Sequence, residues 1–231
     1  MSTELLKKFY GATPERDGQN IYELWEKGTP FGDSITPSGF SSGYVSYVTD
    51  LIVKNTPPRS SIVSLGSGNG FIEAQLAEAG YKVLCVDYNE EAVCITSKKG
   101  LRSICADFYS LPANLFYDVS LIYADGFFGH LYDEEHGGLT PALDHIKSLH
   151  LEAGVKFLVS NDAPVHQNLH VEPHASVPNF WYLSPEFLGV EFEKAGFEKL
   201  HVARFDYNRP VSGARTRSIY LGNHKNRSAD A

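Results

Sequence analysis

The stretch Ser61-Ile-Val-Ser-Leu-Gly-Ser-Gly-Asn-Gly70 organises this chain of 231 residues. Its first half is apolar and rich in β-branched residues, which is typical of a buried strand. Gly66, Gly68 and Gly70 then occupy alternate positions of a turn, and residues 71–80 follow with apolar side chains at helical spacing. The sequence therefore predicts a strand, a glycine-rich turn and a helix, with unpaired backbone N–H groups available to a ligand.

Length and composition indicate one globular domain and exclude several classes of partner. Hydrophobic residues make up 42% and charged residues 21% of the chain, which is the balance of a folded protein. The formal net charge of −8, without a basic run, argues against a nucleic-acid partner. No apolar run has membrane-spanning length, the first residues are too polar for a signal peptide, and the three cysteines lack C-x-x-C spacing. We therefore expect a cytoplasmic monomer or homodimer without a membrane partner.

Strand and helix patterns alternate along most of the chain. Residues 1–58 are expected to form an N-terminal helical lid, with helices at Glu4–Tyr10 and Tyr44–Lys54, and residues 59–222 the core domain. The expected strands of the core are Ile62–Leu65, Lys82–Val86, Ser103–Ala106, Val119–Ala124, Val155–Ser160, Lys199–Tyr207 and Thr216–Leu221. The expected helices are Phe71–Ala79, Glu90–Lys99, a short piece near Ser110–Leu115, Pro141–Leu151 and one that starts at Ser184.

This order predicts an α/β fold with a Rossmann-like, doubly wound sheet of seven strands. The segment between the last two strands is too short for a crossover helix, so the last strand should be antiparallel. Residues 161–182 show no period and are expected to form an irregular loop. Residues 223–231 are polar and are expected to be a disordered tail.

Acidic residues follow the predicted strands at the edge where such sheets bind ligands. Asp87 lies about twenty positions beyond the glycine turn, a spacing suited to gripping the two hydroxyls of a ribose. Asp107 and Asp125 follow the third and fourth strands. Each of them also has a structural explanation, because Asp terminates strands and caps helices.

The position after the turn discriminates between cofactors. A dinucleotide fingerprint, G-x-G-x-x-G, has its third glycine where this chain has Phe71, and a bulky ring there disfavours a pyrophosphate. The turn instead resembles the nucleoside-binding turn of the class I S-adenosylmethionine (SAM)-dependent methyltransferases, and the resemblance extends over residues 61–222. It implies that SAM is the cofactor, and that Asp87 holds its ribose. The other cofactor contacts it implies are Gly66, Ser67 and Gly68 at the methionine and ribose part, Tyr88 stacked on adenine, and Asp107 with Phe108 at the adenine edge.

One position departs from the family pattern. Many members carry an acidic residue in the middle of the first strand, where this chain has Ser64. The group that meets the charged amino end of the cofactor is therefore unassigned from the sequence.

His130 is the best candidate for a base that removes a proton from a methyl acceptor, because its unperturbed pKa suits proton transfer near neutral pH. It follows Asp125 by a Gly-Phe-Phe-Gly loop, and the two side chains are expected at one pocket. In small-molecule members of the resembled family, a tyrosine of the lid often lies near the methyl group, and the resemblance implies that Tyr10 or Tyr22 serves here. Tyr10 is the third predicted catalytic residue. The predicted substrate contacts are Tyr22, His166, His170 and Trp181.

Two further groups have competing interpretations. His166, His170 and His174 recur every four residues, but nearby prolines oppose a helix that would align them, so we expect no metal. Arg215 and Arg217, like Arg209, flank the last hairpin and suit an acceptor carboxylate or phosphate, although a solvated surface position is the commoner outcome.

The leading hypothesis is a methyltransferase of secondary-metabolite biosynthesis that uses SAM to methylate O or N of a small natural-product or heteroaromatic acceptor. Two alternatives stay open. One is an NAD-dependent oxidoreductase on the same fold, and the other is a non-catalytic, methyltransferase-like partner subunit.

Overall fold

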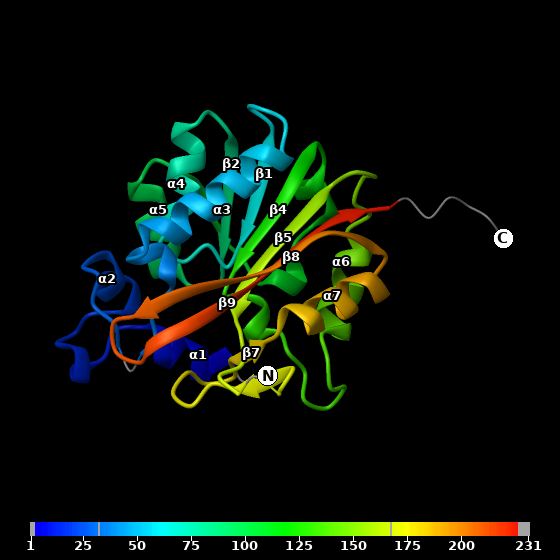
Figure 1. Ribbon diagram of the computed structural model, residues 1–231. Helices are drawn as coiled ribbons and strands as arrows, with labels where there is room; N and C mark the ends of the chain where they lie inside the picture. Colours follow the sequence, from blue (N-terminus) through cyan, green and yellow to red (C-terminus); the bar gives the residue numbers. More distant parts are fainter. Residues whose placement is uncertain (1–2, 32, 167, 226–231) are drawn as a thin grey trace.

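A single seven-stranded sheet runs through the molecule with the strand order β3-β2-β1-β4-β5-β9-β8 (Figure 1). The computed structural model describes residues 3–31, 33–166 and 168–225. All neighbours up to β5 pair in parallel, whereas β9 is antiparallel to both β5 and β8. The predicted doubly wound sheet with an antiparallel last strand is confirmed. The strands are β1 (Ser61–Leu65), β2 (Lys82–Asp87), β3 (Arg102–Cys105), β4 (Val119–Asp125), β5 (Lys156–Asp162), β8 (Phe197–Arg209) and β9 (Gly213–His224).

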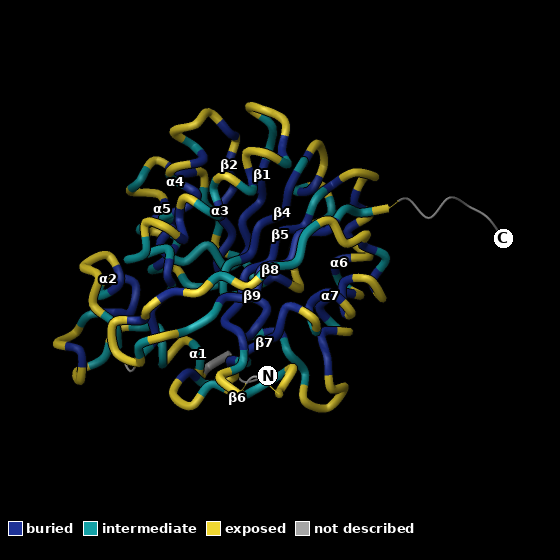
Figure 2. Tube along the Cα trace, viewed as in Figure 1, coloured by how far each residue is buried: buried dark blue, intermediate teal, exposed yellow. Residues whose placement is uncertain are grey.

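Helices cover both faces of this sheet, and each face has its own apolar core. One core cluster joins helices α3 and α4 to the sheet, and a larger one joins α6 and α7 to the opposite face. Figure 2 shows the central strands as the most buried part, with exposed residues in the outer loops. The helices are α3 (Ser42–Asn55), α4 (Phe71–Glu78), α5 (Glu90–Lys98), α6 (Thr140–Ser148) and α7 (Pro185–Lys194), with short 3-10 turns η3 (Phe108–Ser110), η4 (Ala113–Phe116) and η5 (Phe128–His130).

The N-terminal segment divides into two parts. Its last helix, α3, packs into the core through Tyr44, Val48 and Ile52, so it is a layer of the fold. The part before α3 forms a small apolar cluster of its own, which packs against Ala92 of α5. This part covers the ends of the strands. Its elements are α1 (Thr3–Tyr10), η1 (Pro14–Arg16), α2 (Ile21–Glu26) and η2 (Pro37–Gly39).

Two segments differ from the sequence-based expectation. The loop expected over residues 161–182 contains a small antiparallel pair, β6 (Val171–Pro173) and β7 (Trp181–Leu183). Strand β9 continues through Asn223 and His224, because these residues pair with Glu198 and Phe197 of β8. The disordered tail predicted from residue 223 is therefore wrong at its start, and residues 226–231 lie outside the described residues.

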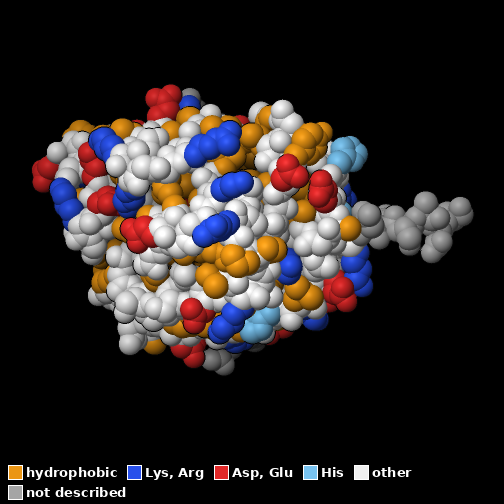
Figure 3. Space-filling view, turned by 90° about the horizontal axis from the view of Figure 1, so that it is seen from above, with side chains coloured by type: hydrophobic (Ala, Val, Ile, Leu, Met, Phe, Trp, Pro, Cys, Tyr) orange, Lys and Arg blue, Asp and Glu red, His pale blue; other side chains and the backbone are white. Residues whose placement is uncertain are grey.

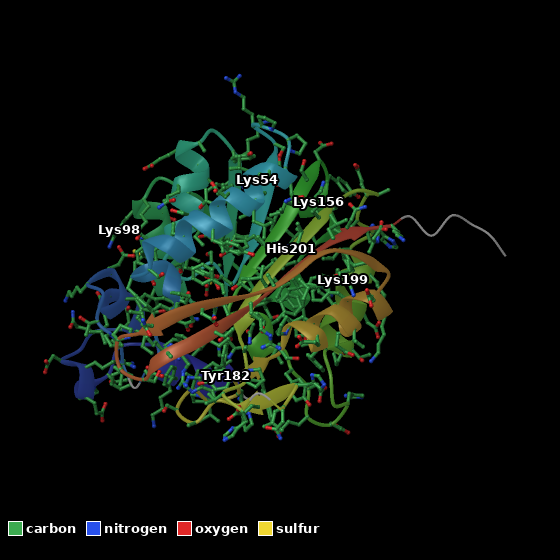
Figure 4. All side chains as sticks on the ribbon, in the orientation of Figure 1. Lys54, Lys98, Lys156, Tyr182, Lys199 and His201 are labelled. Atoms are coloured by element: carbon green, nitrogen blue, oxygen red, sulfur yellow. The ribbon has the colours of Figure 1, made fainter. Side chains whose placement is uncertain are left out.

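The carboxyl ends of the parallel strands all point to one side of the molecule. Figure 4 labels Lys156, where β5 begins, at one end of the sheet and Tyr182 of β7 at the other. The strands therefore end on the side of β7, α1 and α2. Away from that edge, the face seen from above in Figure 3 carries side chains of both charges interspersed with hydrophobic ones. No described helix is long and apolar enough to cross a membrane.

Candidate active site

A cavity of about 510 Å³ lies where the carboxyl ends of the strands meet the N-terminal segment. Its lining includes the glycine turn after β1 and an aspartate at or just after the end of each of the next four strands. The predicted residues that line it are Tyr10, Tyr22, Gly66, Ser67, Gly68, Asp87, Tyr88, Asp107, Phe108, Asp125 and His130. The structure thus gathers these side chains in one place, as ligand sites in doubly wound sheets require.

The glycine turn is held in shape by its own backbone. The N–H groups of Gly66 and Ser67 both donate to the carbonyl of Val86, and the N–H of Gly68 donates to Asp87 Oδ2 at 2.9 Å. Gly66 has a φ of +64°, and a Cβ at this position would lie 2.6 Å from the ring of Phe127. Only glycine fits there, which keeps the turn open to a ligand.

Asp87 is a buried carboxylate at the end of β2. Burial raises its pKa, while hydrogen bonds from the backbone of Asn89 and Gly68 act in the opposite direction. Asp107 lies two residues after the end of β3, before η3, and accepts a hydrogen bond from the backbone N–H of Tyr109 at 2.8 Å. These contacts fix two carboxylates of known orientation at one end of the cavity.

Helix α2 is fastened directly onto the glycine turn. The Nδ2 atom of Asn69 donates to the carbonyl of Tyr22 at 2.8 Å and to Glu26 Oε1 at 2.6 Å. Lys99 Nζ lies 2.6 Å from the same Glu26 oxygen. From the other side, Asn89 Nδ2 donates to the Tyr22 hydroxyl at 2.7 Å. The first part of the chain therefore forms one wall of the cavity.

Tyr10 and His130 meet within this wall. The Tyr10 hydroxyl lies 2.9 Å from His130 Nε2, and His130 Nδ1 lies 3.1 Å from the carbonyl of Asn179. A carbonyl only accepts, so Nδ1 carries the proton and Nε2 accepts from Tyr10. Burial lowers the pKa of His130 to about 4 and raises that of Tyr10. At neutral pH the pair is an uncharged tyrosine hydroxyl facing an uncharged imidazole.

Asp125 has other partners than His130. Its Oδ1 accepts from the Tyr44 hydroxyl at 2.9 Å and pairs with the guanidinium of Arg217, and its Oδ2 accepts from Thr36 Oγ1 at 3.2 Å. Arg217 is 2% exposed, and its Nε donates to Ser160 at 3.0 Å. The carboxylate is thus an anchor that joins the N-terminal segment to β4 and β9.

A second buried ion pair continues this network at the end of β5. Asp162 pairs with Arg209 and with Arg217, whose Nη1 lies 3.1 Å away, and accepts from the Tyr207 hydroxyl at 2.7 Å. Arg209 also lies 3.3 Å from Asp33 of the N-terminal segment. The surface position expected for the arginines is wrong for Arg209 and Arg217, because β8 and β9 place them at buried carboxylates.

The acceptor contacts predicted on the 161–182 segment lie elsewhere. His166 is exposed and pairs with Glu172, His170 contacts the Ser184 hydroxyl at 3.1 Å, and Trp181 packs on Tyr132. None of these three predicted residues lines the cavity. The segment instead contributes His174, Val177 and Phe180, which the β6–β7 hairpin turns inward. In the described part of the chain, no group of three His, Cys, Asp or Glu is arranged to hold a metal ion.

Helix α2 and Glu73 are among the contributors to the site that sequence reasoning missed. Helix α2 was not expected, although Asn20 and Glu23 form a capping box that marks its start. Glu73 in the first turn of α4 lines the cavity. The sequence pointed to it only indirectly, because Ser64 stands where many members of the resembled family have an acidic residue.

Comparisons with known proteins agree with this architecture. No protein-family model matches the chain. A tabtoxin biosynthesis enzyme from Pseudomonas amygdali pv. tabaci is 39% identical over 217 residues, which cover 93% of this chain and 85% of that protein. Magnesium protoporphyrin IX methyltransferase from Synechocystis PCC 6803, solved with bound SAM, has a TM-score of 0.64 at 14% identity and covers 96% of both chains.

The same fold also occurs in an enzyme that is a cyclase. The [4+2]-cyclase SpnF has a TM-score of 0.59 at 15% identity, covering 78% of this chain and 81% of its own. At such identities the likeness concerns the fold, and the reaction has to be argued from the site. The chain belongs to the same family as the tabtoxin biosynthesis enzyme, and its fold is that of the class I SAM-dependent methyltransferases.

Proposed function

We propose that the chain transfers a methyl group from SAM to an oxygen or nitrogen atom of a small-molecule acceptor. The observation that carries this proposal is one cavity in which the glycine turn and Asp87 lie beside the Tyr10–His130 pair. The glycine turn and Asp87 suit a nucleoside. The Tyr10–His130 pair places an uncharged imidazole, which can accept a proton, within one hydroxyl of the cavity. The homologous tabtoxin biosynthesis enzyme supports a role in the biosynthesis of a small molecule.

The residues around the turn fit SAM. The hydroxyls of Ser67 and Tyr123 are buried, line the cavity and have no hydrogen-bond partner among the described residues. Unpartnered hydroxyls that line a cavity are suited to hydrogen bonds with a polar ligand. Asp87 would hold the ribose hydroxyls, and Phe108 and Tyr88 would flank the adenine. When bound, SAM supplies an electrophilic methyl group on a positively charged sulfur.

The chain itself contributes positioning, exclusion of water and a route for a proton. The N-terminal wall covers the cavity, and a volume of about 510 Å³ lies within the range of small-molecule sites, so a nucleoside leaves room only for a compact acceptor. An acceptor proton passes to the Tyr10 oxygen as the Tyr10 proton moves to His130 Nε2. His130 ends protonated on both nitrogens, held by the Asn179 carbonyl.

An NAD-dependent reaction is less well supported. Phe71 lines the cavity at the first position of α4, where a dinucleotide site requires glycine. The Nζ atom of Lys99 lies over the Phe71 ring, 4.2 Å from its centroid. No comparable observation favours a nicotinamide.

Two measurements test the proposal. Calorimetric titration should show binding of S-adenosylhomocysteine and no binding of NAD. Label from methyl-labelled SAM should then pass to a member of a panel of compact hydroxyl- and amine-bearing acceptors. Tight binding without transfer to any acceptor, together with unchanged behaviour of His130→Ala, would point to the non-catalytic alternative.

A further inference from the structure

Glu73 occupies the cavity in an unusual setting for a carboxylate. It is the third residue of α4, it is 4% exposed, and its Oε1 accepts a hydrogen bond from the Ser64 hydroxyl at 2.6 Å. Ser64 is itself 1% exposed and lies in the first core strand, β1. The residue that departs from the family pattern is therefore the one that orients Glu73.

The sheet places a further polar group beside this pair. In the register of the parallel strands, Ser64 lies between Cys85 of β2 and Tyr123 of β4. The Tyr123 hydroxyl is buried, without a hydrogen-bond partner in the described ranges, and Tyr123 lines the cavity together with Glu73. A buried hydroxyl with no partner next to a buried carboxylate indicates that a polar group is missing between them.

Glu73 differs from the other carboxylates of the cavity in its partners. Asp125 and Asp162 have guanidinium partners, and Asp87 and Asp107 accept backbone N–H groups of neighbouring turns. No ion pair joins Glu73 to any Lys or Arg within the described chain, and Ser64 is its side-chain donor. A buried carboxylate without a cationic partner gains stabilisation when a ligand brings a positive charge to it.

We propose that Glu73, oriented by Ser64, binds the ammonium group of the methionine part of SAM. This inference rests on the proposed function. It assigns to helix α4 the negative charge that an acidic residue on the first strand would otherwise supply.

Ligand binding should then be coupled to release of a proton. Burial raises the pKa of Glu73 to about 7, and the hydrogen bond from Ser64 acts against this rise. A bound ammonium favours the carboxylate, so the protonated fraction of Glu73 loses its proton to the solvent on binding. Affinity should rise as the pH increases from about 5.5 to 7.5. The other titratable or charged groups around Glu73 are Cys85 from β2, Tyr123 and Asp125 from β4, and Lys99 after α5.

The first test compares two ligands that differ in the ammonium group. S-adenosylhomocysteine carries the amino-acid end, whereas 5′-methylthioadenosine lacks it. Glu73→Gln keeps an oxygen that can accept from Ser64 but removes the charge. It should lower the affinity for S-adenosylhomocysteine by about 10- to 100-fold and leave the affinity for 5′-methylthioadenosine unchanged. Glu78→Gln is the matched control, because Glu78 is exposed on the same helix. Equal affinity of Glu73→Gln and the unmodified protein for S-adenosylhomocysteine would overturn the inference.

The second test measures the proton directly. Titration with S-adenosylhomocysteine at pH 6.5, in two buffers of different ionisation enthalpy, should show proton release that Glu73→Gln abolishes. The double variant Ser64→Asp/Glu73→Gln returns the charge to β1 and should recover affinity. If Glu73→Gln does not fold, Ser64→Ala should move the midpoint of the pH dependence upward, because it removes a donor to the carboxylate. Identical proton release with and without the Glu73 charge also contradicts the inference. A protein that binds neither ligand refutes the proposed function itself.

Discussion

Replacing Asp162 by asparagine should destabilise the folded state, because Asp162 is the buried carboxylate that both arginines of the ion network share. Asp162 joins the guanidinium groups of Arg209 and Arg217 and the hydroxyl of Tyr207, and it is 2% exposed. Burial alone would raise the pKa of this carboxyl, but the two guanidinium groups and the hydroxyl overcome it and lower the pKa to about 2. Asparagine keeps the shape and removes the charge.

The magnitude follows from two estimates. A carboxyl with a pKa of about 2 in the folded protein and about 3.9 in the unfolded chain adds about 3 kcal/mol to the free energy of unfolding at pH 7. Removing one partner of a buried ion pair costs about 3–5 kcal/mol. Arg217 keeps Asp125 and Arg209 keeps Asp33, so the loss should lie at the lower end, at about 3 kcal/mol.

Urea unfolding followed by circular dichroism measures this loss. Because the pKa is lowered in the folded state, the contribution is complete above pH 5, and about half of it is lost by pH 3. The difference between Asp162→Asn and the unmodified protein should shrink accordingly as the pH falls. Asp206→Asn, at an exposed site on β8, the strand that carries Tyr207 and Arg209, should cost less than about 0.5 kcal/mol. A loss below 1 kcal/mol for Asp162→Asn at pH 7 would refute the reasoning.

Three further changes test the cavity. His130→Ala should lower kcat at saturating cofactor by about 10²–10⁴-fold. The kcat of the unmodified protein should stay constant from pH 8 to pH 6 and fall only towards pH 4, where His130 becomes protonated. An inflection of kcat near pH 6.5 would contradict the role of His130 as the base. Gly66→Ala pushes a methyl group into Phe127 and should cost about 1–3 kcal/mol in the urea experiment, so unchanged stability would show that the turn adjusts freely. Asn69→Ala removes the hydrogen bond to the Tyr22 carbonyl. It should weaken the binding of S-adenosylhomocysteine about 2- to 10-fold and speed up amide hydrogen exchange in α2. Equal exchange rates in the variant and the unmodified protein would mean that other contacts hold α2 against the glycine turn.

Local sequence patterns predicted most of the fold. The strand β1, the glycine turn and α4 are encoded within twenty consecutive residues, and the alternation of strands and helices predicted the parallel part of the sheet. Strands β6 and β7 were not predicted from the sequence, because each has only three residues and β6 contains Pro173, so neither shows a periodic pattern.

The site was predictable only where its residues are close in sequence. The link between Gly68 and Asp87 spans nineteen positions of one β-α-β unit, a spacing that the sequence displays. Tyr10 and His130 were both named as candidates, but their contact joins residues 120 positions apart. The burial of Arg217 depends on β9 pairing with β5 so that Arg217 lies opposite Asp162, and no local pattern specifies that register.

The interior position of β9 has a consequence for the newly synthesised chain. β9 is the last described strand, yet it lies between β5 and β8 in the sheet. Until β9 has left the ribosome, β5 is an open edge and β8 has no neighbour to join. A growing chain that has not yet completed β9 therefore exposes an apolar strand edge, and we expect chains that end before β9 to aggregate.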